Sequence, residues 1–256
     1  MTTTPRILIT GAAGRIGSFL TGYMAGRYDL VLTDIRSPAD THGYPFTEAD
    51  ITDLDAMRAL CRGTDVVIHL AADPSMQAPW ESLLPRNIIG VYNVFQAAHE
   101  AGCRRVIFAS SVNAVFGYPP DVQVHTNMPV RPLNLYGASK AWGEAVACFY
   151  ADQRGLSAIC LRFGWVISRD SPALRPNHPY LDIALTYEDL GKLVVASVEA
   201  PADLRFAIFH GVSNNRWKRL DISDARRVLG YTPEDDAFVL AGLITPEHRT
   251  PNTEQQ

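Results

Sequence analysis

Cysteine, long hydrophobic runs and a strong excess of one charge are scarce or missing in this sequence. The four cysteines among 256 residues lack metal-type spacing and mostly lie in apolar stretches, so reduced core thiols are expected rather than disulfides or metal ligands. No apolar run reaches the roughly 18 residues of a membrane span. The segment 1–6 has no signal-peptide core. We therefore expect a cytoplasmic protein.

A net charge of −4 gives no reason to expect nucleic acid or a membrane as partner. The chain is long enough to bury a sizeable core without a metal. No internal repeat or linker interrupts it. We predict one domain over residues 1–244, followed by a flexible polar tail at residues 245–256.

Short apolar runs alternate with helical patterns along the chain. Buried strands are predicted at residues 7–10, 30–34, 65–72, 105–110, 157–162 and 206–209. Helices are predicted at residues 18–27, 80–101, 135–154, 187–200 and 221–229, with Pro85 bending the second or marking its start. A polar loop is expected at residues 168–179. This alternation predicts an α/β fold with a doubly wound parallel sheet.

A glycine-rich turn follows the first strand. Gly11, Gly14 and Gly17 stand three residues apart, next to the first predicted helix. Such glycines let backbone N–H groups approach a pyrophosphate, which would lie at the positive end of the helix. The motif also fits an ordinary glycine turn, so its context has to decide.

Asp34 supplies that context. It ends the second strand, about twenty residues after the glycines, where a carboxylate can accept hydrogen bonds from a ribose diol. Its charge would repel a 2′-phosphate, so the pattern favours NAD over NADP. Arg15 and Arg36 are nearby cations that leave NADP open.

Tyr136 and Lys140 lie four residues apart and therefore on one face of their predicted helix. A phenol with its usual pKa of about 10 is a poor base at neutral pH. A neighbouring ammonium and a positively charged nicotinamide ring would lower that pKa. Such pairs also arise by chance, but this one follows the glycine-rich turn by about 120 residues, as a catalytic pair would.

These motifs together resemble the extended short-chain dehydrogenases of the NAD-dependent epimerase/dehydratase family. The similarity spans about residues 6–238. It is carried by TGAAGRIG at residues 10–17 and YGASK at residues 136–140, with shorter matches at residues 50–51, 69–72, 87–90, 110–111 and 221–231.

The resemblance implies a catalytic set and a cofactor site. Tyr136 and Lys140 are joined by Ser111, whose plainer interpretation is a cap at the end of its strand, while Ser110 is expected to be structural. NAD is the implied cofactor. The implied contacts, which include the adenine, pyrophosphate and nicotinamide ends, are Gly11, Ala13, Gly14, Arg15, Ile16, Gly17, Asp34, Asp50, Ile51, Leu70, Ala71, Ala72, Asn87, Tyr136, Lys140 and Phe163.

Length narrows the implied substrate. Nucleotide-sugar epimerases and dehydratases are usually longer, because a larger C-terminal lobe encloses a nucleoside diphosphate. The lobe expected here, about residues 165–186 and 203–238, leaves room for a free sugar or sugar acid. Within the family the chain most resembles uronate dehydrogenases, which oxidise the C1 hydroxyl of a uronate to a lactone. The resemblance implies Ser75 and Ser111 as substrate contacts, and Asn113, Trp165 and Arg175 are further candidates.

Departures from the uronate dehydrogenase pattern leave the substrate open. Trp165 and Val112 replace a serine and an asparagine, and the arginine that holds the carboxylate is replaced by an uncharged residue. Arg175, or less favourably Arg169, could take its place, although loop arginines are often only solvated. A neutral aldose would need neither. Trp165 could stack on a sugar or serve only in packing.

Three other functions use the same motifs. A nucleotide-sugar epimerase and a dehydrogenase of another small hydroxy or keto compound would keep the whole set. A cofactor-sensing protein without activity would not need Tyr136, so the intact set argues against it.

A homodimer is also implied. In the family, the helices that correspond to residues 80–101 and 135–154 pair across a two-fold axis. The second helix presents apolar Trp142, Val146, Phe149 and Tyr150 on more than one side, so one stripe is left after packing on the sheet. Cover by the protein's own C-terminal segment is the alternative.

Overall fold

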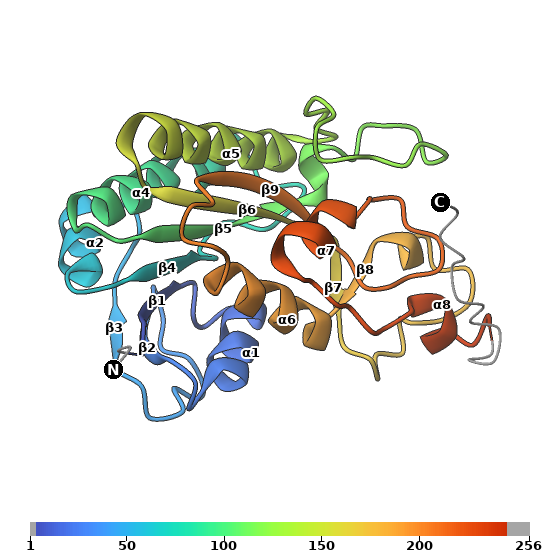
Figure 1. Ribbon diagram of the computed structural model, residues 1–256, viewed down its shortest axis with the longest axis horizontal. Coiled ribbons are helices and arrows are strands. Elements are labelled where there is room, and N and C mark those ends of the chain that lie inside the picture. The colour runs from blue at the N-terminus through green and yellow to red at the C-terminus, as the bar shows by residue number, and fades with distance from the viewer. Residues whose placement is uncertain (1–3, 245–256) are drawn as a thin grey trace.

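Seven parallel strands form one sheet in the computed structural model, which describes residues 4–244 (Figure 1). The order is β3-β2-β1-β4-β5-β6-β9, with all neighbours parallel. The strands are β1 (Arg6–Thr10), β2 (Asp29–Asp34), β3 (Phe46–Glu48), β4 (Val66–His69), β5 (Arg105–Ser111), β6 (Ser157–Phe163) and β9 (Phe206–Gly211). The predicted doubly wound sheet is confirmed, and its order reverses between β1 and β4, where such folds bind ligands.

Helices cover both faces of the sheet (Figure 1). Helices α2 (Leu54–Cys61), α4 (Gly90–Glu100) and α5 (Leu135–Arg154) cover one face, and α1 (Arg15–Met24), α6 (Tyr187–Val198) and α7 (Ser223–Leu229) lie on the other. Side chains alternate along a strand, so Ile7 and Ile9 belong to one core cluster and Leu8 to the other. Cys61, Cys103 and Cys160 are buried free thiols, whereas Cys148 is partly exposed.

Pro85 divides the helix that the sequence predicts over residues 80–101. It separates into α3 (Trp80–Leu83), a π-helical segment η1 (Leu84–Ile89) and α4. Proline has no N–H for the α-helical ladder, and the backbone responds with a wider turn in which the Gly90 N–H donates to the Pro85 carbonyl.

Beyond Gly164 the chain forms a smaller cluster at one end of the sheet (Figure 1). Strands β7 (Trp165–Ile167) and β8 (Ala184–Thr186) pair in parallel, accompanied by the 3-10 turn η3 (Leu181–Ile183) and α8 (Ala237–Leu240). They share a small apolar core of their own. This is the region that the sequence assigns to the substrate lobe, while the tail predicted at residues 245–256 lies outside the described residues.

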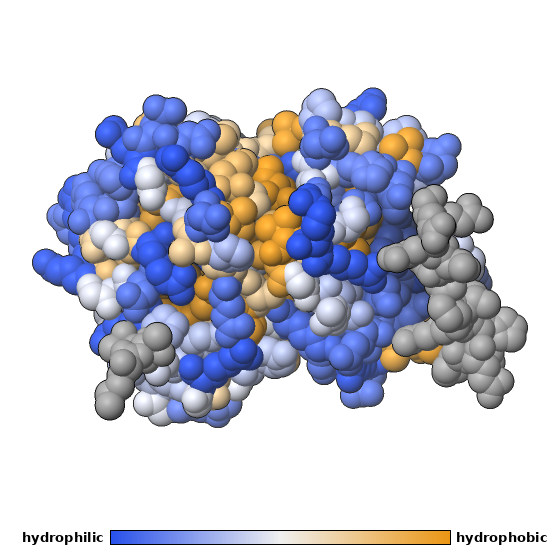
Figure 2. All heavy atoms as spheres, viewed as in Figure 1, coloured by the Kyte–Doolittle hydropathy of each residue, from blue (hydrophilic) through white to orange (hydrophobic). Residues whose placement is uncertain are grey.

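Apolar residues form a band on one face of the molecule (Figure 2). Figure 2 shows hydrophobic residues gathered in a band across the middle of this face, where β9 crosses the same view in Figure 1, between two hydrophilic ends. Within residues 4–244, none of the helices combines the length and hydrophobicity that a membrane crossing requires.

Candidate active site

A cavity of about 730 Å³ opens where β1, β2, β4 and β5 end. It runs from the glycine-rich turn, past the loop after β4, to Trp165 and Tyr180 of the C-terminal cluster. Both its size and its position are typical of a small-molecule site in a doubly wound sheet.

The glycine turn fits closely against the loop after β4. Gly11 has φ +75°, and a Cβ built there would lie 2.7 Å from the Ala71 nitrogen. A Cβ on Gly17 would lie 2.2 Å from the Gly11 carbonyl oxygen. Gly14, the N-cap of α1, has no side chain to satisfy the first N–H groups of the helix. These groups therefore form an anion site of the kind that binds a diphosphate.

Asp34 lies beside this turn and contacts it directly. Its Oδ2 accepts a hydrogen bond from the Ala13 N–H at 3.0 Å. Asp34 lines the cavity together with Arg15 and Arg36. A carboxylate next to a helix N-terminus without capping side chains fits the adenosine ribose and diphosphate of NAD, so the residues present suit this cofactor.

Tyr136 and Lys140 of α5 line the cavity together with Ser111, the last residue of β5. The Lys140 ammonium lies 5.7 Å from the Tyr136 ring centre, and both side chains are buried. Ser111 Oγ accepts hydrogen bonds from the Asn113 backbone N–H at 3.2 Å and side-chain amide at 3.1 Å, and it also hydrogen-bonds to the Tyr136 phenol. Ser111 thus caps the turn after its strand, as its plainer interpretation predicts. It also stands beside the phenol, and its catalytic role stays a prediction.

The sequence analysis predicts that the Lys140 ammonium and the nicotinamide ring together lower the pKa of Tyr136, and the protein's own groups alone do not do so. Burial raises it above 10.0, the Ser111 hydrogen bond lowers it, and the nearby Asp73 carboxylate raises it. Burial also lowers the pKa of Lys140 to about 8. The protein's own groups therefore do not lower the pKa of the phenol, because burial and the Asp73 carboxylate both raise it and only the Ser111 hydrogen bond acts in the other direction. The effect of the nicotinamide ring stays a prediction.

Most of the predicted contact residues line the cavity. Those found there are Gly11, Gly14, Arg15, Ile16, Gly17, Asp34, Asp50, Ile51, Leu70, Ala71, Ala72, Ser111, Asn113, Tyr136, Lys140, Phe163 and Trp165. The Asn113 side chain is held by its neighbours, since its Oδ1 accepts a hydrogen bond from Asn134 at 3.1 Å and its amide donates to Ser111.

Four predicted contacts lie outside the cavity lining. Ala13 meets Asp34 through its backbone instead. The buried Asn87 holds the loop after β4, accepting from the Asp73 N–H at 2.8 Å and donating to the Asp73 carbonyl at 3.1 Å. Ser75 Oγ accepts a hydrogen bond from the Gln77 N–H within its own turn, at 3.2 Å. Arg175 is exposed on the loop beyond.

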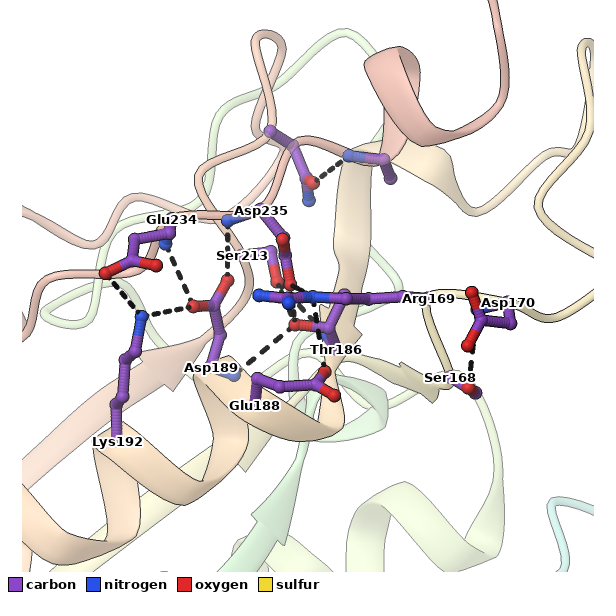
Figure 3. A network of polar contacts seen from close by, with 12 residues as sticks. Ser168, Arg169, Asp170, Thr186, Glu188, Asp189, Lys192, Ser213, Glu234 and Asp235 are labelled. Atoms are coloured by element: carbon purple, nitrogen blue, oxygen red, sulfur yellow. Dashed lines mark hydrogen bonds and ion pairs between the residues drawn. The ribbon is translucent and has the colours of Figure 1, made fainter.

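Arg169 is equally unavailable as a replacement for the missing arginine. Its Nε donates to Asp235 Oδ2 at 2.7 Å and lies 3.5 Å from Glu188 (Figure 3). Thr186 also donates to Asp235, and Asp189 accepts from the Asp235 N–H, so this network ties the C-terminal cluster to α6. Arg169 is therefore held in this network and does not line the cavity.

Several lining residues were missed by the sequence analysis. The aromatic wall combines Trp165 with Phe116 and Tyr180, and the Trp165 ring stacks on His178 at 4.0 Å and 8°. One face of the indole is therefore covered by the protein itself. Asp73 and Arg86 line the cavity beside the loop after β4. Their only signal in the sequence was closeness to the matched stretches.

Comparison with known proteins gives consistent results. Residues 7–194 match the profile of the NAD dependent epimerase/dehydratase family. The chain is 38% identical to an NAD-dependent glucose-6-phosphate dehydrogenase of Haloferax volcanii, covering 90% of this chain and 94% of that protein. It is 35% identical to a uronate dehydrogenase of Pseudomonas putida, covering 95% and 90%. The crystal structure of an Agrobacterium tumefaciens uronate dehydrogenase mutant in complex with NAD matches with a TM-score of 0.84 at 31% identity, covering 99% and 93%.

Proposed function

The chain belongs to the NAD dependent epimerase/dehydratase family, and from that premise we propose that it oxidises the C1 hydroxyl of a free sugar acid or aldose to a lactone. The family together with the dehydrogenase relatives supports an NAD-dependent oxidoreductase. One observation carries the proposal: Tyr136, Ser111 and the glycine turn line the same cavity. The similarity to a glucose-6-phosphate dehydrogenase and to a uronate dehydrogenase supports a sugar as substrate.

In this proposal each residue has a separate task. Tyr136, as phenolate, takes the proton of the C1 hydroxyl. Ser111 accepts its hydrogen bonds from Asn113, so its own hydrogen remains to orient the phenol or the substrate oxygen. The Lys140 ammonium, together with the positively charged nicotinamide ring of bound NAD, favours the phenolate against the effect of burial. NAD, when bound, supplies the acceptor for the hydride that leaves C1.

The proposal is tested by NADH release from a panel of free sugars. Purified protein with NAD should produce NADH, followed by absorbance, with at least one hexuronate, hexose phosphate or aldose. Nucleotide-sugars should be poor substrates. Conversion of a nucleotide-sugar to its epimer without release of NADH would instead identify an epimerase, the second use of the same residues.

Asp34 should set the cofactor preference. We expect Asp34→Ala to reduce the preference for NADH over NADPH by about tenfold or more, since hydrogen bonds to charged groups have roughly this effect. Fluorescence titration of both cofactors measures the two dissociation constants. Asp40→Ala, an exposed acid of the following loop that does not line the cavity, should change neither. Tighter binding of NADPH than of NADH by the unaltered protein would contradict this role.

We propose a homodimer because apolar side chains gather on neighbouring helices. Val146 and Tyr150 of α5 are buried against the core, whereas Trp142 and Phe149 are 43% and 47% exposed. Exposed apolar residues also lie within α3, η1 and α4, namely Trp80, Leu84, Ile89 and Tyr92. Monomers seldom leave such a surface in water, and a two-fold pairing would cover it.

Light scattering tests the dimer. At micromolar concentration we expect about twice the chain mass of 28.2 kDa. The double substitution Trp142→Glu and Phe149→Glu should yield monomers, because charges would be desolvated at the centre of the contact. Trp217→Glu, at a 60% exposed tryptophan beside α8, is the matched control and should remain dimeric. A monomeric mass for the unaltered chain would rule the dimer out.

A further inference from the structure

We propose that Arg86 binds the anionic end group of the sugar substrate, a carboxylate or a phosphate remote from C1. This inference rests on the proposed function and deepens it, because it names the substrate class. It answers a question that the sequence leaves open, since Arg175 and Arg169 both lie outside the cavity lining. Among the described residues, four cationic side chains do line it: Arg15, Arg36, Arg86 and Lys140.

Position separates Arg86 from the other three. Arg15 and Arg36 lie near Asp34, where the adenosine end of NAD is expected, and Lys140 is buried beside Tyr136. Arg86 comes from η1 and lines the cavity beside the loop after β4, which contributes Asp73, Pro74 and Met76. It is therefore the cation available to the part of the substrate that points away from the cofactor.

The guanidinium is oriented but not used up. Its Nη1 donates to Ser82 Oγ at 2.5 Å and lies 3.7 Å from Asp73 Oδ2. Within the described residues, these contacts involve Nη1 alone, and the side chain is 51% exposed. Nε and Nη2 are thus left to form the two parallel hydrogen bonds by which arginine binds carboxylates and phosphates.

Asp73, the negative group next to Arg86, is held in place by its neighbours. Its backbone N–H and carbonyl are both held by the buried Asn87, and its carboxylate accepts hydrogen bonds from the Ser75 N–H at 3.0 Å and from Ser82. Although burial acts in the opposite direction, these hydrogen bonds and Arg86 hold the pKa of Asp73 below its usual 3.8.

The cavity therefore carries a negative group near Tyr136 and a positive group farther toward solvent. Asp73 is close enough to raise the pKa of Tyr136, and its side chain is 18% exposed against 51% for Arg86. A sugar anion is repelled from the reacting end and attracted to the outer one. This order would present C1, rather than the charged end, to Tyr136.

Binding measured without turnover tests the inference. In a Tyr136→Phe background saturated with NAD, calorimetric titration with D-glucuronate, D-glucose 6-phosphate and D-glucose gives three dissociation constants. At least one anionic sugar should bind more tightly than glucose, and the two anionic arms distinguish carboxylate from phosphate. Adding Arg86→Ala should weaken that anion by about tenfold to hundredfold, as expected for lost charge-assisted hydrogen bonds. Glucose binding should change less than twofold.

Two further variants separate recognition from folding. Arg86→Lys, which keeps the charge but not the fork, should restore part of the anion affinity. Arg175→Ala, which removes an exposed arginine outside the cavity, should have no effect.

Three results would overturn the role of Arg86: glucose binding as tightly as both anions, anion binding that survives Arg86→Ala, or equal weakening of glucose and anion. Absence of NADH release with every sugar would instead overturn the proposed reaction. The two failures are therefore distinguishable.

Discussion

Replacing Tyr136 with phenylalanine should lower kcat/KM for sugar oxidation by about 10²–10⁴-fold, the usual contribution of a general acid or base. The substitution removes only the phenol oxygen. The ring packs with Ala78 and Leu83, and phenylalanine keeps that contact. Stability and NADH affinity should therefore change little, so the loss falls on the chemical step.

The same variant tests whether Tyr136 causes the pH dependence of kcat/KM. Only the ionised phenol accepts a proton, and burial raises the pKa of Tyr136, so kcat/KM should rise with pH through the neutral and mildly alkaline range. The residual rate of Tyr136→Phe should lack this rise.

Tyr118→Phe serves as the control. It removes a hydroxyl that donates to the Pro129 carbonyl at 3.0 Å, outside the cavity lining, and should leave both the rate and its pH profile unchanged. More than a tenth of the activity remaining in Tyr136→Phe would mean that another group takes the proton.

Glu144→Ala should lower the free energy of unfolding by about 3–5 kcal/mol, because it leaves a buried arginine without its counter-ion. Glu144 and Arg162 are 4% and 1% exposed, and two hydrogen bonds of 2.8 and 2.9 Å join them. Ser110 also donates to Glu144, at 2.6 Å. Glu144 lies one helical turn after Lys140 on α5, and Ser110 lies next to Ser111 at the end of β5. The network therefore holds the end of the strand that carries Ser111.

Chemical denaturation followed by circular dichroism measures this loss. The control is Asp29→Ala, which breaks an exposed ion pair with Arg6 and should cost less than about 1 kcal/mol. A similar small loss in Glu144→Ala would show that Arg162 finds water or another partner. That result would remove the argument that this network supports the active site.

Local geometry explains why part of the site could be predicted. Tyr136 and Lys140 share one helix face by spacing alone, and Asp34 ends a strand whose apolar run is plain in the sequence. Ser110 was expected to be structural, and it bonds to Glu144 as such a residue would. The first residue of α1 was harder to predict. The helix begins at Arg15 and not at the predicted residue 18, with Gly17 inside its first turn. Because glycine is a poor helix former, the sequence places the start after Gly17.

The remainder depended on how loops pack. Asp73 and Arg86 reach the cavity because Asn87 pins one loop, a contact that no periodicity reveals. Ser75 was carried over by resemblance and Arg175 was chosen as the nearest substitute for the missing arginine, yet loops are where related chains differ most in path. The effect of burial on the Tyr136 pKa also could not be predicted, since burial cannot be read from spacing.

Transfer of deuterium from C1 tests the central claim most directly. The protein is incubated with NAD and sugars deuterated only at C1, and mass spectrometry follows the reduced cofactor and the sugar product. Oxidation at C1 predicts reduced cofactor that carries the deuterium, together with a lactone or its hydrolysed acid that has lost it. Reduced cofactor without deuterium, or an epimerised sugar without net reduced cofactor, would contradict the account.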